Sequence, residues 1–180
     1  MERYRIVKDV ALYYLTFTVV EWLPVFIDET ACKIVTDSLN YCIRNKSLGV
    51  IAYVIMPTHL HAILFDIEFN SDRLKKTLGG LRKFTGQKLV DHAALHLPKI
   101  YMEALKESAG KDRQHRFWQP TQHPVGIISE SVWKQKMDYL HYNPCRKGLV
   151  RCPEDWRFSS ARTWLTGEAG DVQVSDIGWN

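Results

Sequence analysis

The chain has 180 residues, of which 46% are hydrophobic and 24% are charged. This length and composition are typical of one globular domain with its own core, and they exclude a disordered or fibrous protein. The formal net charge of +4 allows a nucleic-acid partner without requiring one. No apolar run approaches the roughly 20 residues of a membrane helix, and no glycine-rich phosphate-binding motif occurs, so we expect no membrane association and no nucleotide cofactor.

The cysteines and the first residues bear on the cellular compartment. The four cysteines form no C-x-x-C pair, and the opening MERYRIVKDV lacks both the apolar segment and the cleavage site of a signal peptide. These features favour a cytoplasmic protein with reduced thiols.

The first part of the chain alternates between strand and helix patterns. β-branched and aromatic residues dominate 11–20, which predicts a strand. Apolar residues recur at helical spacing after Asp28, a residue suited to cap a helix. The apolar runs that follow are separated only by the link Pro57-Thr58, which predicts a hairpin. The predicted elements are a strand at 11–20, a helix at 28–46, and strands at 49–56 and 59–67.

The second part begins with a long helix predicted at 71–93. Leucines form its apolar stripe, and Asn70 or Ser71 is its candidate cap. The pair Gly79-Gly80 weakens its middle by about 1 kcal/mol per glycine relative to alanine. The polar stretch 96–115 is predicted to be an irregular, flexible connection. A fourth strand is expected within 115–129, and a further helix at 129–143 is expected to end at Pro144.

This order of elements predicts the fold. Strand, helix, strand, strand, helix, strand describes an α+β, ferredoxin-like βαββαβ sandwich, in which an antiparallel sheet carries helices on one face. The last helix is added to that fold, and a C-terminal extension follows it. We assign residues 1–165 to the domain and 166–180 to a C-terminal tail. The fold serves many unrelated functions, so function must come from the site.

Two histidines interrupt the apolar third strand in PTHLHAILF, residues 57–65. Residues i and i+2 of a strand share a face, so His59 and His61 project side by side and can be ligands of one metal ion. Two core histidines that bond to backbone carbonyls, or two exposed histidines on an edge strand, would give the same pattern. Burial of two imidazoles without partners is costly, and a metal is one way to satisfy both.

The last helix, SESVWKQKMDYLHYNP, carries a second candidate cluster. Tyr139 and Asn143 are four residues apart and share a helix face, with Lys136 one turn earlier. A tyrosine in this position is also compatible with packing, and an asparagine before a proline with a helix end. The interpretation therefore depends on the combination with the histidines.

Basic residues gather in two places. In the long helix, Lys75 and Arg82 are seven residues apart, as are Lys76 and Lys83, so each pair lies near one face and could contact phosphates. An ordinary solvated helix face is the alternative. A second cluster follows the tyrosine: Arg146, Lys147 and Arg151.

The two motifs together resemble a known family. PTHLHAILF, with a hydrophobic residue between two histidines, and YLHYNPCRKGLV, with a tyrosine four residues before Asn-Pro, are similar to the single-tyrosine HUH transposases. Within that family they most resemble the REP-associated tyrosine transposase branch. RFWQ and DWRFSS also match the usual flanking features, so that the resemblance covers roughly residues 10–165.

The resemblance implies a function and a role for each residue. His59, His61 and, less firmly, Asn143 would hold a divalent metal, Mg²⁺ or Mn²⁺, and Tyr139 would be the nucleophile. The protein would cleave and rejoin single-stranded or hairpin DNA through a 5′-phosphotyrosine intermediate. Lys75, Lys76, Arg82, Lys83, Lys136, Arg146 and Lys147 would contact the DNA. Either a monomer or a homodimer is compatible with the family.

Other functions remain open at this point. A non-catalytic DNA-binding protein on the same fold would have no use for the histidines and the tyrosine together. A two-histidine phosphoesterase would need a second His-x-Thr or His-x-Ser motif, which the sequence lacks in a matching place. Tyr142, three residues after Tyr139, is the rival nucleophile.

Overall fold

A four-stranded antiparallel sheet forms the centre of the molecule, in a computed structural model that describes residues 5–8, 10–111, 114–121 and 123–178. The strand order is β2-β3-β1-β4, and every neighbouring pair is antiparallel. β2 and β3 form the predicted hairpin, turning at residues 57–58. The predicted α+β class is confirmed. The strands are β1 (Leu12–Thr18), β2 (Leu48–Met56), β3 (His59–Asp66) and β4 (Val125–Ile127).

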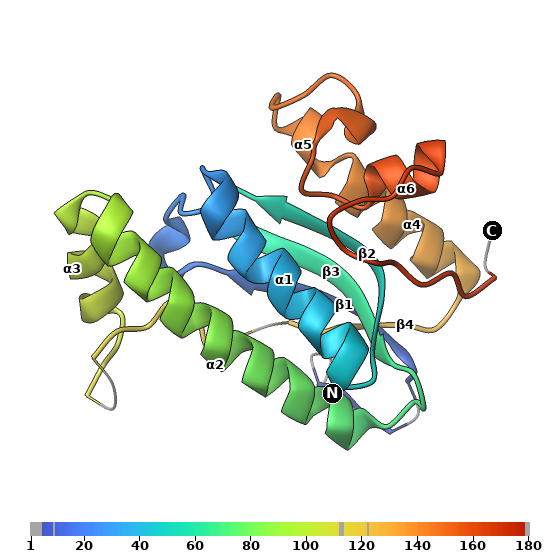
Figure 1. The fold of residues 1–180 in the computed structure, drawn as a ribbon. Coiled ribbons are helices and arrows are strands. Elements are labelled where there is room, and N and C mark those ends of the chain that lie inside the picture. The colour runs from blue at the N-terminus through green and yellow to red at the C-terminus, as the bar shows by residue number, and fades with distance from the viewer. Residues whose placement is uncertain (1–4, 9, 112–113, 122, 179–180) are drawn as a thin grey trace.

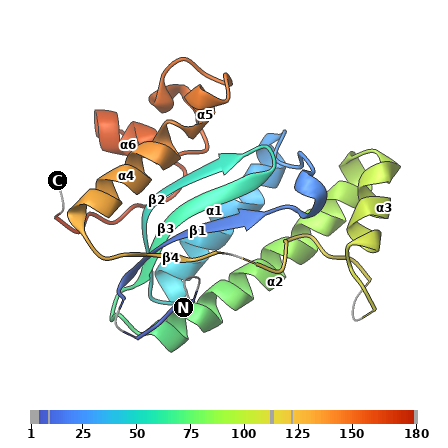
Figure 2. The ribbon, with the colours of Figure 1, turned by 180° about the vertical axis from the view of Figure 1, so that it is seen from behind.

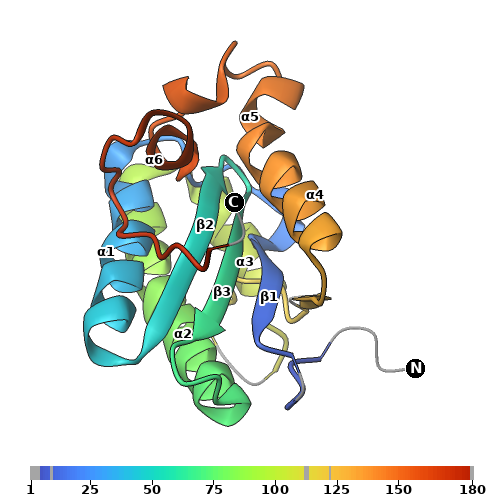
Figure 3. The ribbon, with the colours of Figure 1, turned by 90° about the vertical axis from the view of Figure 1, so that its right-hand side faces the viewer.

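Helices cover both faces of this sheet. Figures 1 and 2 show α1 and α2 side by side on one face. Figure 3 shows α4 on the opposite face, followed by α5, whereas α6 lies by the β2 edge of the sheet. The helices are α1 (Glu29–Asn45), α2 (Ser71–His96), α3 (Lys99–Glu107), α4 (Glu130–His141), α5 (Asn143–Arg146) and α6 (Ala161–Thr166), with short turns η1 (Val20–Trp22) and η2 (Pro153–Asp155).

The alternation of side chains along β3 divides the core in two. Leu60, Ala62 and Leu64 pack toward α1 and α2, whereas Ile63 packs toward α4. Because His59 and His61 have the same parity as Ile63, they lie on the α4 face. The predicted apolar stripe of α4, formed by Trp133, Met137 and Leu140, is buried against this face.

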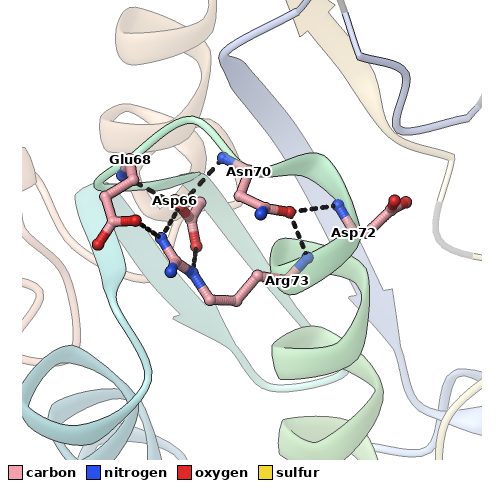
Figure 4. Close-up of polar contacts among 5 residues, drawn as sticks. All are labelled: Asp66, Glu68, Asn70, Asp72 and Arg73. Atoms are coloured by element: carbon pink, nitrogen blue, oxygen red, sulfur yellow. Dashed lines mark hydrogen bonds and ion pairs between the residues drawn. The ribbon is translucent and has the colours of Figure 1, made fainter.

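The far end of β3 is tied to α2 by one buried carboxylate, drawn in Figure 4. Asp66 accepts two hydrogen bonds from the guanidinium of Arg73, both 2.6 Å long, and two more from the backbone N–H groups of Glu68 and Asn70. These bonds, above all those from Arg73, hold the pKa of Asp66 below its ordinary value. Asn70 caps α2 by accepting from the N–H groups of Asp72 and Arg73, so it is the cap, and not Ser71.

Two predictions about helix boundaries were wrong. The stretch predicted to be irregular, 96–115, contains α3, because Leu105 is fully buried in the main core; residues 112–113 of that stretch lie outside the described residues. The helix predicted to end at Pro144 ends at His141. Pro144 instead lies in the first turn of α5, where the absent N–H costs no hydrogen bond.

The C-terminal segment covers the outer edge of the sheet. The indole N–H groups of Trp156 and Trp164 donate to the β2 carbonyls of Ile55 and Ile51, at 2.9 and 2.8 Å. Ser175 adds a backbone bond of 2.7 Å from its N–H to the carbonyl of Val50. An edge strand is thereby kept from pairing with another chain. In the described part of the chain, no helix is both long and apolar enough to span a membrane.

Candidate active site

His59 and His61 lie side by side at the start of β3, as the strand periodicity predicts. Their ring centroids are 4.5 Å apart, and both residues are buried, with 9% and 6% of their surface exposed. On the neighbouring β1, Thr16 lies opposite His61 and Thr18 lies opposite His59. Because β3 lies between β1 and β2, the pair is flanked by a strand on each side, and it faces α4.

Each imidazole is oriented by hydroxyl groups at its Nδ1 atom. Nδ1 of His61 lies 2.7 Å from the hydroxyl of Tyr14 and 2.8 Å from that of Thr16. Nδ1 of His59 lies 2.8 Å from the hydroxyl of Thr58. A hydroxyl oxygen can accept a hydrogen bond from Nδ1–H, and in that tautomer the lone pair is on Nε2. Neither Nε2 atom forms a hydrogen bond within the described residues.

The surroundings keep both imidazoles neutral. Burial, with a smaller contribution from the nearby charge of Lys147, lowers the pKa of His59 to about 4. Burial lowers the pKa of His61 to about 3, with His59 and Lys136 contributing in the same direction. A neutral imidazole is the form that binds a metal ion.

Of Tyr139 and Tyr142, the two candidate nucleophiles, Tyr139 is the one that the structure brings to the histidines. Its ring centroid lies 5.6 Å from that of His61 and 6.3 Å from that of Tyr14, yet 43% of its surface remains exposed. The exposed Tyr142 makes no ring contact with a described residue. The geometry therefore favours Tyr139 over its rival.

Asn143 occupies the first position of α5 and is 4% exposed. Its side-chain amide makes no hydrogen bond to any described residue, so its oxygen is available to a ligand. No hydrogen bond or ring contact joins it to either histidine in that part of the chain. Its predicted role as third ligand stays a prediction.

Three of the predicted basic residues lie at this site. The Nζ atom of Lys136 is 4.9 Å from the ring centroid of Tyr14, and the guanidinium carbon of Arg146 is 5.4 Å from that of Tyr139. Lys147, exposed at the end of α5, is close enough to His59 to affect its pKa. One of these cations lies against the exposed Tyr139 and the other two lie near Tyr14 and His59, a distribution that suits a polyanionic substrate.

The basic residues of α2 are not part of this site, because α2 lies across the sheet from α4 (Figure 3). Lys75 pairs with Asp72 at 3.0 Å, and Lys76 lines a groove of about 1100 Å³ between α1 and α2. Arg82 donates to the backbone carbonyl of Gln119. Lys83 is exposed on the same helix.

Sequence reasoning missed the hydroxyl groups around the histidines and the exposed Trp22, whose ring centroid is 5.7 Å from that of His59. Tyr14 and Thr16 alternate on the predicted first strand, so a shared face could have been inferred. Their partner could not, because the register of β1 against β3 depends on tertiary contacts.

The histidine pair fits a divalent metal. Both rings are neutral and oriented by hydrogen bonds at Nδ1, as is usual for metal-binding histidines. The described residues contain no group of three or more His, Cys, Asp or Glu side chains suited to a metal. The remaining ligands would therefore be an amide, water or substrate oxygens.

Comparison with known proteins gave a sequence match and several structural matches. No protein-family model matches the chain. A protein of Haemophilus influenzae described as a REP-associated tyrosine transposase is 28% identical over 111 residues, which cover 61% of this chain and 57% of that relative. The matched stretch thus spans little more than half of the relative. A solved structure of a REP-associated tyrosine transposase bound to a REP hairpin superposes with a TM-score of 0.60 and 19% identity, over 98% of this chain and 93% of the other.

The fold, the histidine pair and the facing tyrosine agree with the predicted resemblance to the single-tyrosine transposases. Both the sequence match and the structural match are to REP-associated tyrosine transposases, the branch that the sequence motifs resemble most. The chain is therefore similar to that branch in sequence and in fold.

Proposed function

We propose that this protein cleaves and rejoins single-stranded, hairpin-associated DNA, with Tyr139 as the nucleophile. The observation that carries the proposal is the exposed Tyr139 ring, 5.6 Å from the ring of His61 and flanked by cationic side chains. The structural neighbour was solved with a REP hairpin, which supports DNA of that kind as the substrate class.

The reaction exchanges one phosphate ester for another. The Tyr139 hydroxyl oxygen forms a bond to phosphorus and releases its proton to solvent. The bond from phosphorus to the 3′ oxygen breaks, and that oxygen takes up a proton. The products are a 5′-phosphotyrosine and a free 3′-hydroxyl. Because an ester is conserved, the 3′-hydroxyl of another strand can reverse the step without ATP.

We infer that His59 and His61 hold a divalent ion, Mg²⁺ or Mn²⁺, with Asn143 as the candidate third ligand. The neutral rings support this assignment, as does the absence of a hydrogen bond from either Nε2 atom to a described residue. When bound, such an ion polarises the scissile phosphate and stabilises negative charge on its non-bridging oxygens. Neutral ligands leave the charge of the ion uncompensated, which favours binding of a phosphate.

Lys136, Arg146 and Lys147 would contact phosphates on either side of the scissile bond. Arg146 lies over the ring of Tyr139, so its guanidinium is close to the proposed reacting oxygen. Guanidinium groups bind phosphate oxygens through paired hydrogen bonds. These residues would therefore position the strand against the tyrosine.

We also infer that the scaffold is a ferredoxin-like sandwich. The strand order β2-β3-β1-β4, with α1 and α2 on one face, supports it. In that fold the second face of the sheet is free, and here α4 carries Tyr139 across it to the histidines. The added helix thus completes the site.

The test is formation of a covalent protein–DNA adduct on a labelled REP hairpin with single-stranded flanks, in the presence of Mn²⁺. We expect the wild-type protein to form the adduct, and Tyr139→Phe to bind the hairpin with unchanged affinity but to form none. Tyr142→Phe is the matched control and should retain the adduct. Peptide mapping that placed the DNA on Tyr142 would refute the assignment.

The same assay separates the enzyme from a non-catalytic binder. His59→Ala and His61→Ala should lose the adduct and bind Mn²⁺ more weakly by calorimetry, while hairpin affinity changes little. Hairpin binding by the wild type without any adduct would instead support a DNA-binding protein that does not cleave.

A further inference from the structure

Trp22 is a large aromatic side chain that stands exposed beside the histidines. Its ring centroid is 5.7 Å from that of His59 at an interplanar angle of 79°, and 57% of its surface is exposed. An exposed tryptophan forgoes the substantial stabilisation that burial would give it. Its position next to a polar site therefore calls for a ligand that covers it.

The backbone holds Trp22 in an unfavourable conformation. Glu21 and Trp22 are consecutive non-glycine residues with positive φ, at 51° and 54°. Left-handed conformations cost roughly 1–2 kcal/mol per residue. The other non-glycine residues with positive φ in the described chain, Ser47, Phe69 and His123, occur singly. Such strain persists only where the surrounding structure enforces it, and it is concentrated at functional sites.

The structure around η1 enforces this conformation. The N–H groups of Val19 and Phe26 donate to the carbonyls of Thr58 and Pro57, both at 3.0 Å. Between them, the N–H of Val20 donates to the carbonyl of Phe117 at 2.9 Å. The turn that presents Trp22 is thus hydrogen-bonded to the hairpin turn that leads into His59, which places the backbone of Trp22 beside the start of β3.

We propose that Trp22 is a stacking platform for one unpaired base of the DNA, next to the phosphate held at His59 and His61. The inference rests on the proposed function, and it names the residue that positions the strand at the site. An indole face stacks on any base, and removal of such a platform weakens single-strand binding by about 5- to 150-fold. We therefore expect tight binding of an unpaired flank, with little dependence on which base is stacked.

The probe is a REP hairpin oligonucleotide with an unpaired 5′ or 3′ extension that carries 2-aminopurine at successive positions. Binding is measured in the full chain with Tyr139→Phe, so that no cleavage occurs. One position should lose fluorescence on binding, because stacking on the indole quenches 2-aminopurine. Trp22→Ala should remove that quenching and weaken binding of the extended hairpin by about 5- to 150-fold. Trp22→Phe should retain most of the affinity.

Phe69 provides a matched control, because it is also exposed, at 62%, and also has a positive φ of 56°. It lies beyond the opposite end of β3 and stacks on Phe65. Phe69→Ala should change neither the quenching nor the affinity. In the chain that retains Trp22, an abasic nucleotide at the quenched position should lower the affinity by as much as Trp22→Ala does. In the Trp22→Ala chain, the same abasic nucleotide should lower the affinity no further.

Two results would overturn the platform: unchanged quenching and affinity in Trp22→Ala, or an equal loss for hairpins with and without the extension. These results are independent of the chemistry, because adduct formation is measured separately in chains that retain Tyr139. If Trp22→Ala forms the adduct at the wild-type rate with unchanged affinity, the platform fails and the proposed function stands. If the wild type forms no adduct while the quenching depends on Trp22, the cleavage proposal fails and the platform stands.

Discussion

Asp66 joins β3 to α2 through one buried side chain that accepts four hydrogen bonds. We expect Asp66→Asn to lower the free energy of unfolding at pH 7 by about 1–2 kcal/mol, since its charged partner Arg73 is partly solvated. The folded-state pKa of Asp66 is depressed, so its stabilisation is present above the unfolded pKa near 3.9 and is lost as pH falls through the folded value. Urea unfolding at pH 7 and at about pH 3 measures the difference in free energy of unfolding between the wild type and Asp66→Asn. We expect this difference to be smaller at pH 3.

Asp72 is the control for this prediction. It is 76% exposed, and Lys75 is its only ion-pair partner among the residues that the structure describes. Asp72→Asn should change stability by less than about 0.5 kcal/mol at either pH. An effect of Asp66→Asn that did not diminish in acid would show that its carboxylate charge is not the source of the stabilisation.

The sequence was informative about single residues where the periodicity of a strand or helix decides. It predicted that His59 and His61 share a face, which the structure confirms. It could not identify Tyr14, whose hydroxyl reaches His61 only through the pairing of β1 with β3, 47 residues apart. The roles assigned to these residues remain predictions.

At the scale of the elements, the glycine pair in the middle of α2 has no structural requirement. A Cβ atom at Gly79 or Gly80 would meet no atom within 4 Å, and both residues are exposed. Each substitution by alanine should therefore raise the free energy of unfolding by about 1 kcal/mol, through helix propensity alone. Thermal or urea unfolding measures the gain.

Gly86, on the same helix, serves as the comparison. A Cβ there would approach Trp118 at 3.4 Å and Phe117 at 3.6 Å, so Gly86→Ala should gain less. A destabilising effect of Gly79→Ala would mean that α2 departs from regular helix at that point.

An element was predicted accurately where its own residues carry a clear periodic pattern and a cap, and poorly where tertiary packing decides its conformation. α1, α2 and the hairpin have long periodic runs and clear caps, and their predicted ends differ from the observed ones by three residues or fewer. α3 has nine residues and one fully buried side chain, so little in its own sequence distinguishes it from a loop. Its packing against the main core decides its conformation.

At the scale of the whole molecule, the two basic clusters lie on opposite faces of the sheet. If the proposed function holds, a short single strand engaged at Tyr139 would reach Lys136 and Lys147, but not Lys76 and Lys83. Substitution of the first pair by alanine should reduce the slope of log affinity against log salt by about 0.7 per lost phosphate contact. Substitution of the second pair should leave the slope unchanged. The measurement is titration of a short labelled strand at several salt concentrations.

A reduced slope for the Lys76 and Lys83 pair would contradict this expectation. It would mean that DNA passes around the sheet to the α2 face, as the sequence alone suggested. Repeating the titration with a long-stemmed hairpin tests whether only longer DNA reaches the α2 face, because the Lys76 and Lys83 substitutions would then reduce the slope for the long hairpin alone.

The cover of β2 has a consequence for synthesis of the chain. Residues 156–175 bond to the carbonyls of β2 but leave the ribosome about 100 residues after that strand. Until they emerge, the sheet presents an open edge beside apolar surface, the combination through which nascent chains associate wrongly. Ribosomes that stall before Trp156 would release a chain that contains the histidines and the tyrosine but leaves the β2 edge exposed and prone to aggregation. Quality control by chaperones and proteases would act on such products, so the emergence of residues 156–175 would affect the yield of folded protein.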